Sequence, residues 1–185
     1  MHRGPLGVAA LNEQLQHALN PSEPSRPERR LGGRVLRTGD RVLVTKNWHE
    51  REVFNGDTGT VVRLDPLAPS AELALDDGRR VDFDAAELET LLHAYALSVH
   101  RAQGSEFPAV VLVLHSLHGS MLRRDLLYTA VTRARSLLVM VGSQHALGRA
   151  IRIGEGTARY NALNHRLRAA FSNEAARTDR TGGPN

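Results

Sequence analysis

The sequence has 185 residues, of which 41% are hydrophobic, so the chain is long enough to bury one or two small cores. It contains no cysteine, which excludes a disulfide framework and a thiolate zinc site and favours the reducing cytoplasm. The formal net charge is +4, but Lys46 is the only lysine among 24 lysines and arginines, and this bias makes the total charge a weak indicator of a nucleic-acid partner. No apolar run approaches the roughly 18 residues of a membrane span, so we expect a cytoplasmic protein without membrane contact.

The first segment, residues 4–20, has the pattern of a packing helix. Apolar residues recur at helical spacing on one face, which predicts that this face is the buried one. Asn20 and Pro21 end the helix, because a residue before proline is biased away from helical geometry. Residues 21–34 are rich in proline, glycine and charge, and we expect a solvated connection there. The stripe consists of Val8, Leu11, Leu15, Ala18 and Leu19.

Residues 35–90 change to a pattern of short strands. Apolar runs at 35–36, 41–44, 52–54, 60–64, 72–75 and 79–83 are separated by turn signals. Asn55-Gly56 is a strong hairpin signal, and Asp77-Gly78 is a second turn. Short strands with turns this close together predict a small β-barrel.

Trp48 is the only tryptophan, and two roles remain open for it. An exposed tryptophan could stack on a base, whereas a buried one would cap the core of the barrel. Exposure decides between the two, and the sequence does not give it.

A cluster of polar residues at 98–106 lies between two apolar runs, 95–99 and 110–114. Continuous β-branched runs are typical of strands buried on both faces of a parallel sheet. Ligands of such sheets bind at the carboxyl ends of the strands, so the cluster lies where a site is expected. The alternative is an ordinary polar connection.

The remaining chain continues the alternation of helices and strands. We expect a helix at 125–135, an apolar strand at 137–142, and a helix from about His145 that Ser143 caps. An amphipathic helix at 157–171 and a disordered tail at 172–185 follow. His115 and His118 form a pair without cysteine or acidic partners, so we expect a surface loop and no metal site.

Two of these segments resemble known motifs. The cluster from Ser98 to Phe107 resembles motif V of superfamily 1 helicases, in the form of the RecD/TraA group. Residues 127–135, Leu-Tyr-Thr-Ala-Val-Thr-Arg-Ala-Arg, resemble motif VI of the same enzymes, and the two occur in the family's order with a strand between them. The segment from Gly39 to Gly59 is similar to an inserted barrel in that family, so the resemblance covers roughly residues 4 to 170.

The resemblance implies roles for individual residues. Arg133 matches the motif VI arginine that reaches the γ-phosphate of ATP across the interface between two lobes. Gln103, Gly104 and Glu106 match the nucleotide-facing turn of motif V. The positions that face DNA are Ser98 and His100 in the lobe and Asn47, Trp48 and Asn55 in the barrel.

The sequence also lacks what an independent ATPase needs. A loop of the form Gly-x-x-x-x-Gly-Lys-Ser/Thr must hold the phosphates, and an acidic residue must hold magnesium; neither motif is present. The resemblance therefore implies that ATP and Mg²⁺ bind mainly to an N-terminal RecA-like lobe, in the same polypeptide or in another chain.

We accordingly predict an α/β fold: a RecA-like parallel-sheet lobe (1–34 and 91–171), without a P-loop, with an inserted SH3-like β-barrel (35–90). Its implied function is the second motor lobe of a RecD-like, 5′–3′ DNA helicase of repair or recombination, which grips single-stranded DNA. The alternatives are the helicase part of a TraA-type conjugative relaxase, one half of a split motor, and a single-stranded DNA-binding module without ATPase activity.

Overall fold

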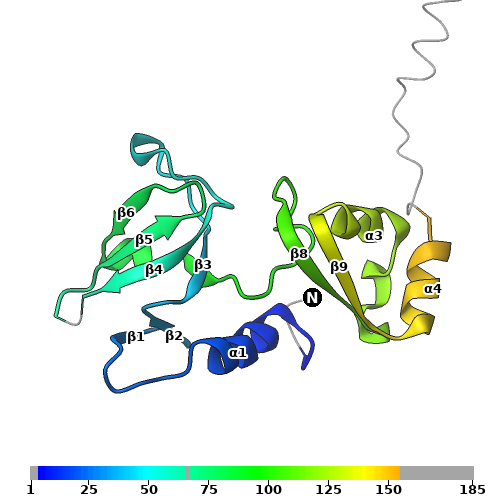
Figure 1. The fold of residues 1–185 in the computed structure, drawn as a ribbon, viewed down its shortest axis with the longest axis horizontal. Coiled ribbons are helices and arrows are strands. Elements are labelled where there is room, and N and C mark those ends of the chain that lie inside the picture. The colour runs from blue at the N-terminus through cyan, green and yellow to red at the C-terminus, as the bar shows by residue number, and fades with distance from the viewer. Residues whose placement is uncertain (1–3, 66, 155–185) are drawn as a thin grey trace, which may run out of the picture.

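The computed structural model describes residues 4–65 and 67–154 (Figure 1), so the predicted helix at 157–171 and the predicted tail lie outside the described residues. The helices are α1 (Val8–Leu19), α2 (Ala85–Leu88), α3 (Arg124–Val131) and α4 (Gln144–Arg152), with 3-10 turns at His49–Arg51 and Ser116–Met121. The strands are β1 (Glu28–Leu31), β2 (Arg34–Arg37), β3 (Arg41–Val44), β4 (Thr58–Leu64), β5 (Ala71–Leu75), β6 (Arg80–Phe83), β7 (Leu91–His93), β8 (Phe107–Leu114) and β9 (Ala134–Gly142). No helix in this part of the chain is both long and apolar enough to cross a membrane.

The middle of the chain forms an antiparallel sheet with the strand order β6-β5-β4-β3-β7. Residues of β5 alternate between buried and half-buried, and the buried side chains belong to a core that includes Val42, Val61, Leu73 and Phe83. Within the described residues the edge strands β6 and β7 do not pair with each other, so the SH3-like domain is an open, curled sheet rather than a closed barrel. Gly59 lets β4 and β5 approach, because a Cβ there would lie 2.6 Å from the carbonyl oxygen of Ala74.

Two predictions for this region were wrong. The segment at 52–54 contributes only an isolated bridge between Trp48 and Val53, because the 3-10 turn precedes it and Glu52 has a positive φ of 54°. The connection at 21–34 is more ordered than predicted, since β1 and β2 form an antiparallel hairpin around Gly32.

Helix α1 forms where expected, but its most buried residues lie on an adjoining polar face, whereas Val8, Leu11 and Leu15 of the predicted stripe are only half-buried. Asn12, Gln16 and Asn20 are buried, whereas Leu19 of the predicted stripe is 69% exposed. The polar face is the buried one because it donates hydrogen bonds to a carboxylate that lies inside the domain. Without these bonds the buried charge would be unpaired, which would be very costly in free energy. The assumption that the apolar stripe is the core face was therefore wrong.

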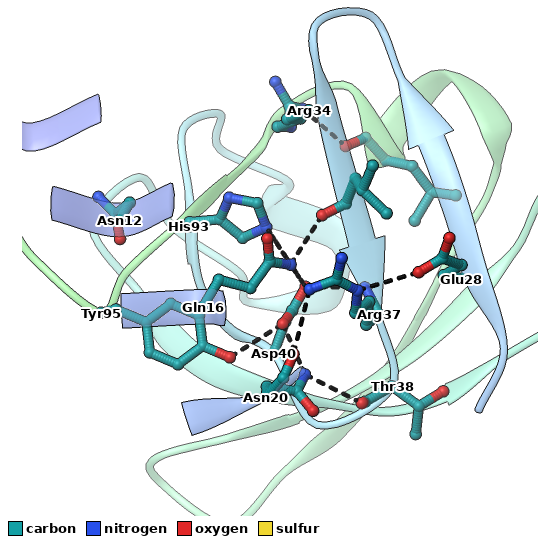
Figure 2. A network of polar contacts seen from close by, with 12 residues as sticks. Asn12, Gln16, Asn20, Glu28, Arg34, Arg37, Thr38, Asp40, His93 and Tyr95 are labelled. Atoms are coloured by element: carbon teal, nitrogen blue, oxygen red, sulfur yellow. Dashed lines mark hydrogen bonds and ion pairs between the residues drawn. The ribbon is translucent and has the colours of Figure 1, made fainter. Parts of the chain in front are cut away.

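That carboxylate is Asp40, in the turn between β2 and β3, and it is fully buried (Figure 2). It accepts hydrogen bonds from Gln16 Nε2 and Asn20 Nδ2, both at 2.7 Å, and from the hydroxyl of Tyr95 at 2.9 Å. The backbone N–H of Arg37 also donates to it at 2.7 Å, and Nε2 of His93 lies 3.3 Å away. We call Asn12, Gln16, Asn20, Asp40, His93 and Tyr95 the Asp40 junction.

The same contacts indicate which ring nitrogen of His93 carries a hydrogen. The side-chain amide of Gln16 donates both of its hydrogens, one to Asp40 and one to the carbonyl oxygen of Val35 at 2.8 Å. Nε2 of His93 lies 3.2 Å from the same nitrogen, which has no hydrogen left for it. Nε2 of His93 therefore carries a hydrogen and donates it to Asp40.

Acid is expected to weaken the Asp40 junction. Burial raises the pKa of Asp40, but hydrogen bonds from His93, Asn20, Arg37 N–H and Tyr95 outweigh it, so the pKa lies below its ordinary value of 3.8. A lowered folded-state pKa stabilises the fold above the unfolded pKa, and this contribution is lost as the pH falls from about 4 through the folded pKa. Asp40→Asn should therefore cost more stability near pH 7 than near pH 3, measured by urea unfolding with Trp48 fluorescence. An equal cost at both pH values would contradict this, and the difference between variant and wild type removes the shared effect of other carboxylates.

The C-terminal unit contains β8 and β9, which pair in parallel from Phe107↔Ala134 to Leu114↔Gly142. A small core of Leu114, Leu122, Ala146 and Ala150 lies between this pair and helices α3 and α4. Ser143 caps α4 as predicted, because its hydroxyl accepts a hydrogen bond from Ala146 N–H at 3.1 Å. Several apolar side chains of the two strands remain exposed: Val111, Leu137, Val139, Met140 and Val141.

Two further predictions were wrong in this unit. Residues 95–99 form no strand. The backbone N–H of Ala94 makes the last hydrogen bond to β3, and the side chain of Asn12 then hydrogen-bonds both the N–H and the carbonyl oxygen of Ala96. The helix predicted to reach Arg135 ends at Val131, since β9 already begins at Ala134.

Candidate functional site

The polar cluster is a compact turn that leads into β8. The carbonyl oxygen of Ser98 accepts from the N–H groups of Arg101 and Ala102, and Ala102 in turn accepts from Ser105 N–H. Gly104 has a φ of +85°, a conformation that side chains with a Cβ rarely adopt, and no atom lies within 4 Å of where its Cβ would be. His100, Gln103 and Gly104 are exposed, so this turn presents polar groups and an open backbone to a ligand.

Arg133 joins this turn to the end of α3. Its Nη1 donates to the carbonyl oxygen of Ser105 at 2.9 Å, and its Nε donates to the carbonyl oxygen of Thr129 at 3.0 Å. Its Nη2 lies 3.1 Å from the hydroxyl of Thr132, and its own carbonyl oxygen accepts from Phe107 N–H at 2.8 Å. The structure therefore brings the two sequence motifs into direct contact.

The partners of Arg133 decide what its charge can do. All three are neutral oxygens, and no carboxylate in the described part of the chain forms an ion pair with Arg133. A guanidinium always carries its charge and presents five donors in a rigid fork. Arg133 is half-buried, so it is held in place while its positive charge stays uncompensated, as an anion-binding group requires.

Glu106 lies beside Arg133 and pairs with a different arginine. Its Oε2 is 2.9 Å from Nε of Arg135, and the two side chains are 53% and 64% exposed. An ion pair in water at this exposure contributes about 0–1 kcal/mol, so Glu106 can exchange its partner for a ligand at little cost.

The predicted DNA contacts of the barrel lie around the turn that follows β3. Asn47 and Asn55 are exposed and adjacent, since Oδ1 of Asn47 accepts from Asn55 N–H at 2.7 Å. Trp48 instead packs edge-on against Phe83, with ring centroids 5.4 Å apart, and Arg51 covers it at 5.4 Å. Of the two roles left open for Trp48, the structure favours the cap on the core.

The exposed aromatic ring of this turn is Phe54, which the sequence analysis did not single out. It is 43% exposed and packs against His49 in a T-shaped arrangement, with ring centroids 5.8 Å apart. The sequence carries no signal for this exposure; in the structure Val53 is fully buried, and its neighbour in an extended segment points the other way. Phe54, Asn47 and Asn55 thus form one exposed surface.

The histidine pair after β8 serves local structure. The ring Nδ1 of His115 accepts from Leu117 N–H at 3.1 Å, and Nδ1 of His118 lies 3.3 Å from His115 N–H. Both rings thereby cap the 3-10 turn. Among the described residues no group of three histidine, aspartate or glutamate side chains could hold a metal ion.

Two family models of helicase domains match the part of the chain that contains these features. The family model of the UvrD-like helicase C-terminal domain matches residues 93–141, which contain the polar turn, both parallel strands and Arg133. The model of the ATP-dependent RecD-like DNA helicase SH3 domain matches residues 11–76. Over these two ranges the chain is similar to the RecD-like DNA helicases.

Two curated relatives agree with this assignment. The chain is 44% identical over 170 residues to the ATP-dependent RecD2 DNA helicase of Deinococcus radiodurans, which covers 91% of this chain and 23% of that protein. It is 35% identical over 168 residues to the RecBCD enzyme subunit RecD of Mycolicibacterium smegmatis, covering 91% of this chain and 28% of that protein. The chain therefore spans about a quarter of the length of these relatives.

Solved structures show the same fold. A Bacteroides Pif1 helicase in complex with ADP-AlF3 and single-stranded DNA matches with a TM-score of 0.57 at 20% identity, covering 89% of this chain and 43% of that one. Two coordinating Pif1 helicases at forked DNA match with a TM-score of 0.56 at 22% identity, over 90% of this chain and 42% of that one.

Proposed function

We propose that this chain is the second motor lobe of a RecD-like, ATP-dependent DNA helicase, and that it acts with an N-terminal RecA-like lobe. The observation that carries the proposal is Arg133, which neutral oxygens hold in place and which no carboxylate within residues 4–65 and 67–154 neutralises. An arginine supplied to a γ-phosphate stabilises the charge of the transition state, and phosphoryl transfer depends almost entirely on such stabilisation and on positioning.

The neighbouring residues take complementary roles in this proposal. Gln103, Gly104 and Glu106 face the nucleotide, and Glu106 leaves Arg135 to do so. Ser98 and His100 contact the DNA backbone from the lobe, while Asn47 and Asn55 contact it from the SH3-like domain. The described residues offer no acidic cluster for Mg²⁺, so we assign the metal, with the bulk of the ATP site, to the N-terminal lobe.

The exposed faces of β8 and β9 support the proposal that a further part of the protein packs on them. Parallel strands normally have neighbours on both sides and helices on both faces, yet β8 and β9 pair only with each other in the described residues. Val111, Val139 and Val141 are 63%, 41% and 52% exposed on these strands. We propose that additional strands and helices of the longer polypeptide cover them.

The domain division follows from the same proposal. The lobe comprises 1–34 and 91–171, and the SH3-like domain at 35–90 is inserted into it. Helix α1 of the lobe is hydrogen-bonded to the inserted domain through Asp40. A helicase of this kind would move 5′ to 3′ on single-stranded DNA in the cytoplasm, in repair or recombination.

The experiment is a chimera. The C-terminal segment of Deinococcus radiodurans RecD2 that matches this chain is replaced by residues 1–185, which the 44% identity makes feasible. The chimera should hydrolyse ATP in response to single-stranded DNA, whereas the isolated chain should not exceed background. Turnover by the isolated chain that Arg133→Ala abolishes would contradict the proposal, because the isolated sequence has no P-loop.

The isolated chain should also bind single-stranded DNA with strong salt dependence. Each phosphate contact made by arginine or lysine releases counterions, and the slope of log K against log[salt] is about −0.7 per contact. Fluorescence anisotropy of a labelled oligothymidine from low to high salt measures this slope. An affinity that does not change with salt would mean that the DNA role is wrong. Salt-dependent binding combined with an inactive chimera would instead favour a DNA-binding module without ATPase activity.

A further inference from the structure

The Asp40 junction lies where four separate segments of the chain meet. Gln16 comes from α1 and Asn20 from its C-cap, Asp40 from the turn before β3, His93 from β7, and Tyr95 from the segment after it (Figure 2). Oδ1 of Asp40 accepts from Asn20 and Tyr95, and Oδ2 accepts from Gln16, Arg37 N–H and His93. Every acceptor position of the carboxylate is used, so the group is a fully satisfied buried charge.

The junction also holds the chain that leads into the polar turn. Asn12 donates from Nδ2 to the carbonyl oxygen of Ala96 at 2.8 Å and accepts from Ala96 N–H at 3.0 Å. Together with the bond from Tyr95 to Asp40, this fixes residues 95 and 96 in a stretch that forms neither strand nor helix. Ser98, where the polar turn begins, follows two residues later.

Polar contacts, rather than apolar packing, hold α1 against the SH3-like sheet. The buried side chains of α1 and its C-cap are Asn12, Gln16 and Asn20, whereas Leu11 and Leu15 are only half-buried and Leu19 is 69% exposed. Charge-assisted hydrogen bonds are shorter, stronger and more directional than apolar contacts. Such a contact fixes the orientation of the helix and the link, whereas an apolar face would allow sliding.

We propose that Asp40 is a positioning residue that fixes the SH3-like sheet, α1 and the base of the polar turn at 98–106 as one rigid piece. The inference rests on the proposed function, because that function places DNA contacts on the sheet and nucleotide contacts on the turn. With the junction intact, a displacement of the turn on nucleotide binding moves the DNA-contacting sheet with it. With the junction broken, the two surfaces respond separately.

The experiment compares Asp40→Asn and Asn12→Ala with Val61→Ala in the full 185-residue chain. The side chain of Val61 is fully buried in the same sheet and makes no hydrogen bond to the junction. Its backbone N–H donates to the carbonyl oxygen of Asp40 at 3.0 Å, and alanine keeps this bond, so the truncation lowers stability without releasing the polar turn. Urea unfolding first establishes the stability of each variant. Asn12→Ala keeps Asp40 and its partners intact, so it tests the idea even if Asp40→Asn fails to fold.

The first readout is hydrogen exchange of the backbone amides at 95–106, which needs no DNA. Exchange there should accelerate by about tenfold or more in Asp40→Asn and Asn12→Ala, beyond any acceleration in Val61→Ala. Equal acceleration in Val61→Ala would show that the junction only contributes stability, and unchanged exchange in the junction variants would overturn the proposal.

The second readout is affinity for oligothymidine. Removing the negative charge of Asp40 would by itself strengthen binding to a polyanion, so a several-fold loss of affinity in Asp40→Asn must come from misplacement of the contacts. A gain or no change in affinity would overturn the proposal. Failure of the wild-type chain to bind DNA would instead overturn the proposed function, and the exchange result would still stand for the junction.

Discussion

Replacing Arg133 with lysine in the chimera should reduce DNA-stimulated ATP hydrolysis by about 10³-fold or more, with little change in DNA affinity. Lysine keeps the positive charge but lacks the planar fork that holds Arg133 on Ser105 and Thr129 while it contacts a phosphate. A steady-state phosphate-release assay at saturating oligothymidine measures the effect. The rate of ATP hydrolysis of Arg133→Ala should lie within a few fold of the rate of the lysine variant.

Arg124 provides the matched control for this prediction. It lies in the first turn of α3, the helix that ends two residues before Arg133, is exposed, and donates from Nε to the carbonyl oxygen of Ile151 at 2.9 Å. Arg124→Lys should leave hydrolysis within about twofold of wild type, as expected of a surface substitution. Comparable losses in both variants would mean that Arg133 has no special role.

Truncating the two aromatic side chains next to Val53 should separate stability from DNA binding. Trp48→Ala should cost about 3 kcal/mol of unfolding free energy, because Trp48 packs on Phe83 and under Arg51. Phe54→Ala should cost little stability, since the ring is 43% exposed, but should weaken single-strand binding by about 1–3 kcal/mol if one base stacks on it. Urea unfolding and anisotropy titrations give the two quantities.

An abasic oligonucleotide shows whether stacking is responsible. Phe54→Ala should weaken binding to oligothymidine but not to a strand of equal length and charge that lacks bases. Leu67→Ala is the matched control, because Leu67 is 95% exposed on another loop of the same domain. Loss of affinity for both strands, or an equal loss in Leu67→Ala, would contradict a stacking role for Phe54.

The sequence predicted the elements whose local signals agree with their burial. Strands β3, β4, β5 and β6 combine alternating apolar residues with strong turns, and all four lie where expected. Arg133 was found because its motif is a contiguous run of residues, which continues from α3 past the helix end at Val131 into the start of β9. The contact between Arg133 and Ser105, by contrast, joins residues 28 positions apart and became visible only in the structure.

Two of the errors share a physical cause, which is that a buried charge can reverse the meaning of a pattern. The apolar stripe of α1 predicted the wrong buried face. Asp40 lies 20 positions after Asn20 in the sequence, and no feature of residues 4–20 reveals that this carboxylate is buried against the helix. The run at 95–99 reads as a strand, yet Asn12 and Asp40 hold its backbone outside any sheet. Trp48 and Phe54 were separable only through exposure, a tertiary property.

DNA unwinding by the chimera of the RecD2 N-terminal region and residues 1–185 tests directly whether this chain is a motor lobe. We expect ATP-dependent unwinding of a tailed duplex by the chimera, none by RecD2 lacking its matched C-terminal segment, and none by the Arg133→Ala chimera. A chimera that folds and binds single-stranded DNA but neither hydrolyses ATP nor unwinds the duplex would contradict the assignment of this chain as a motor lobe.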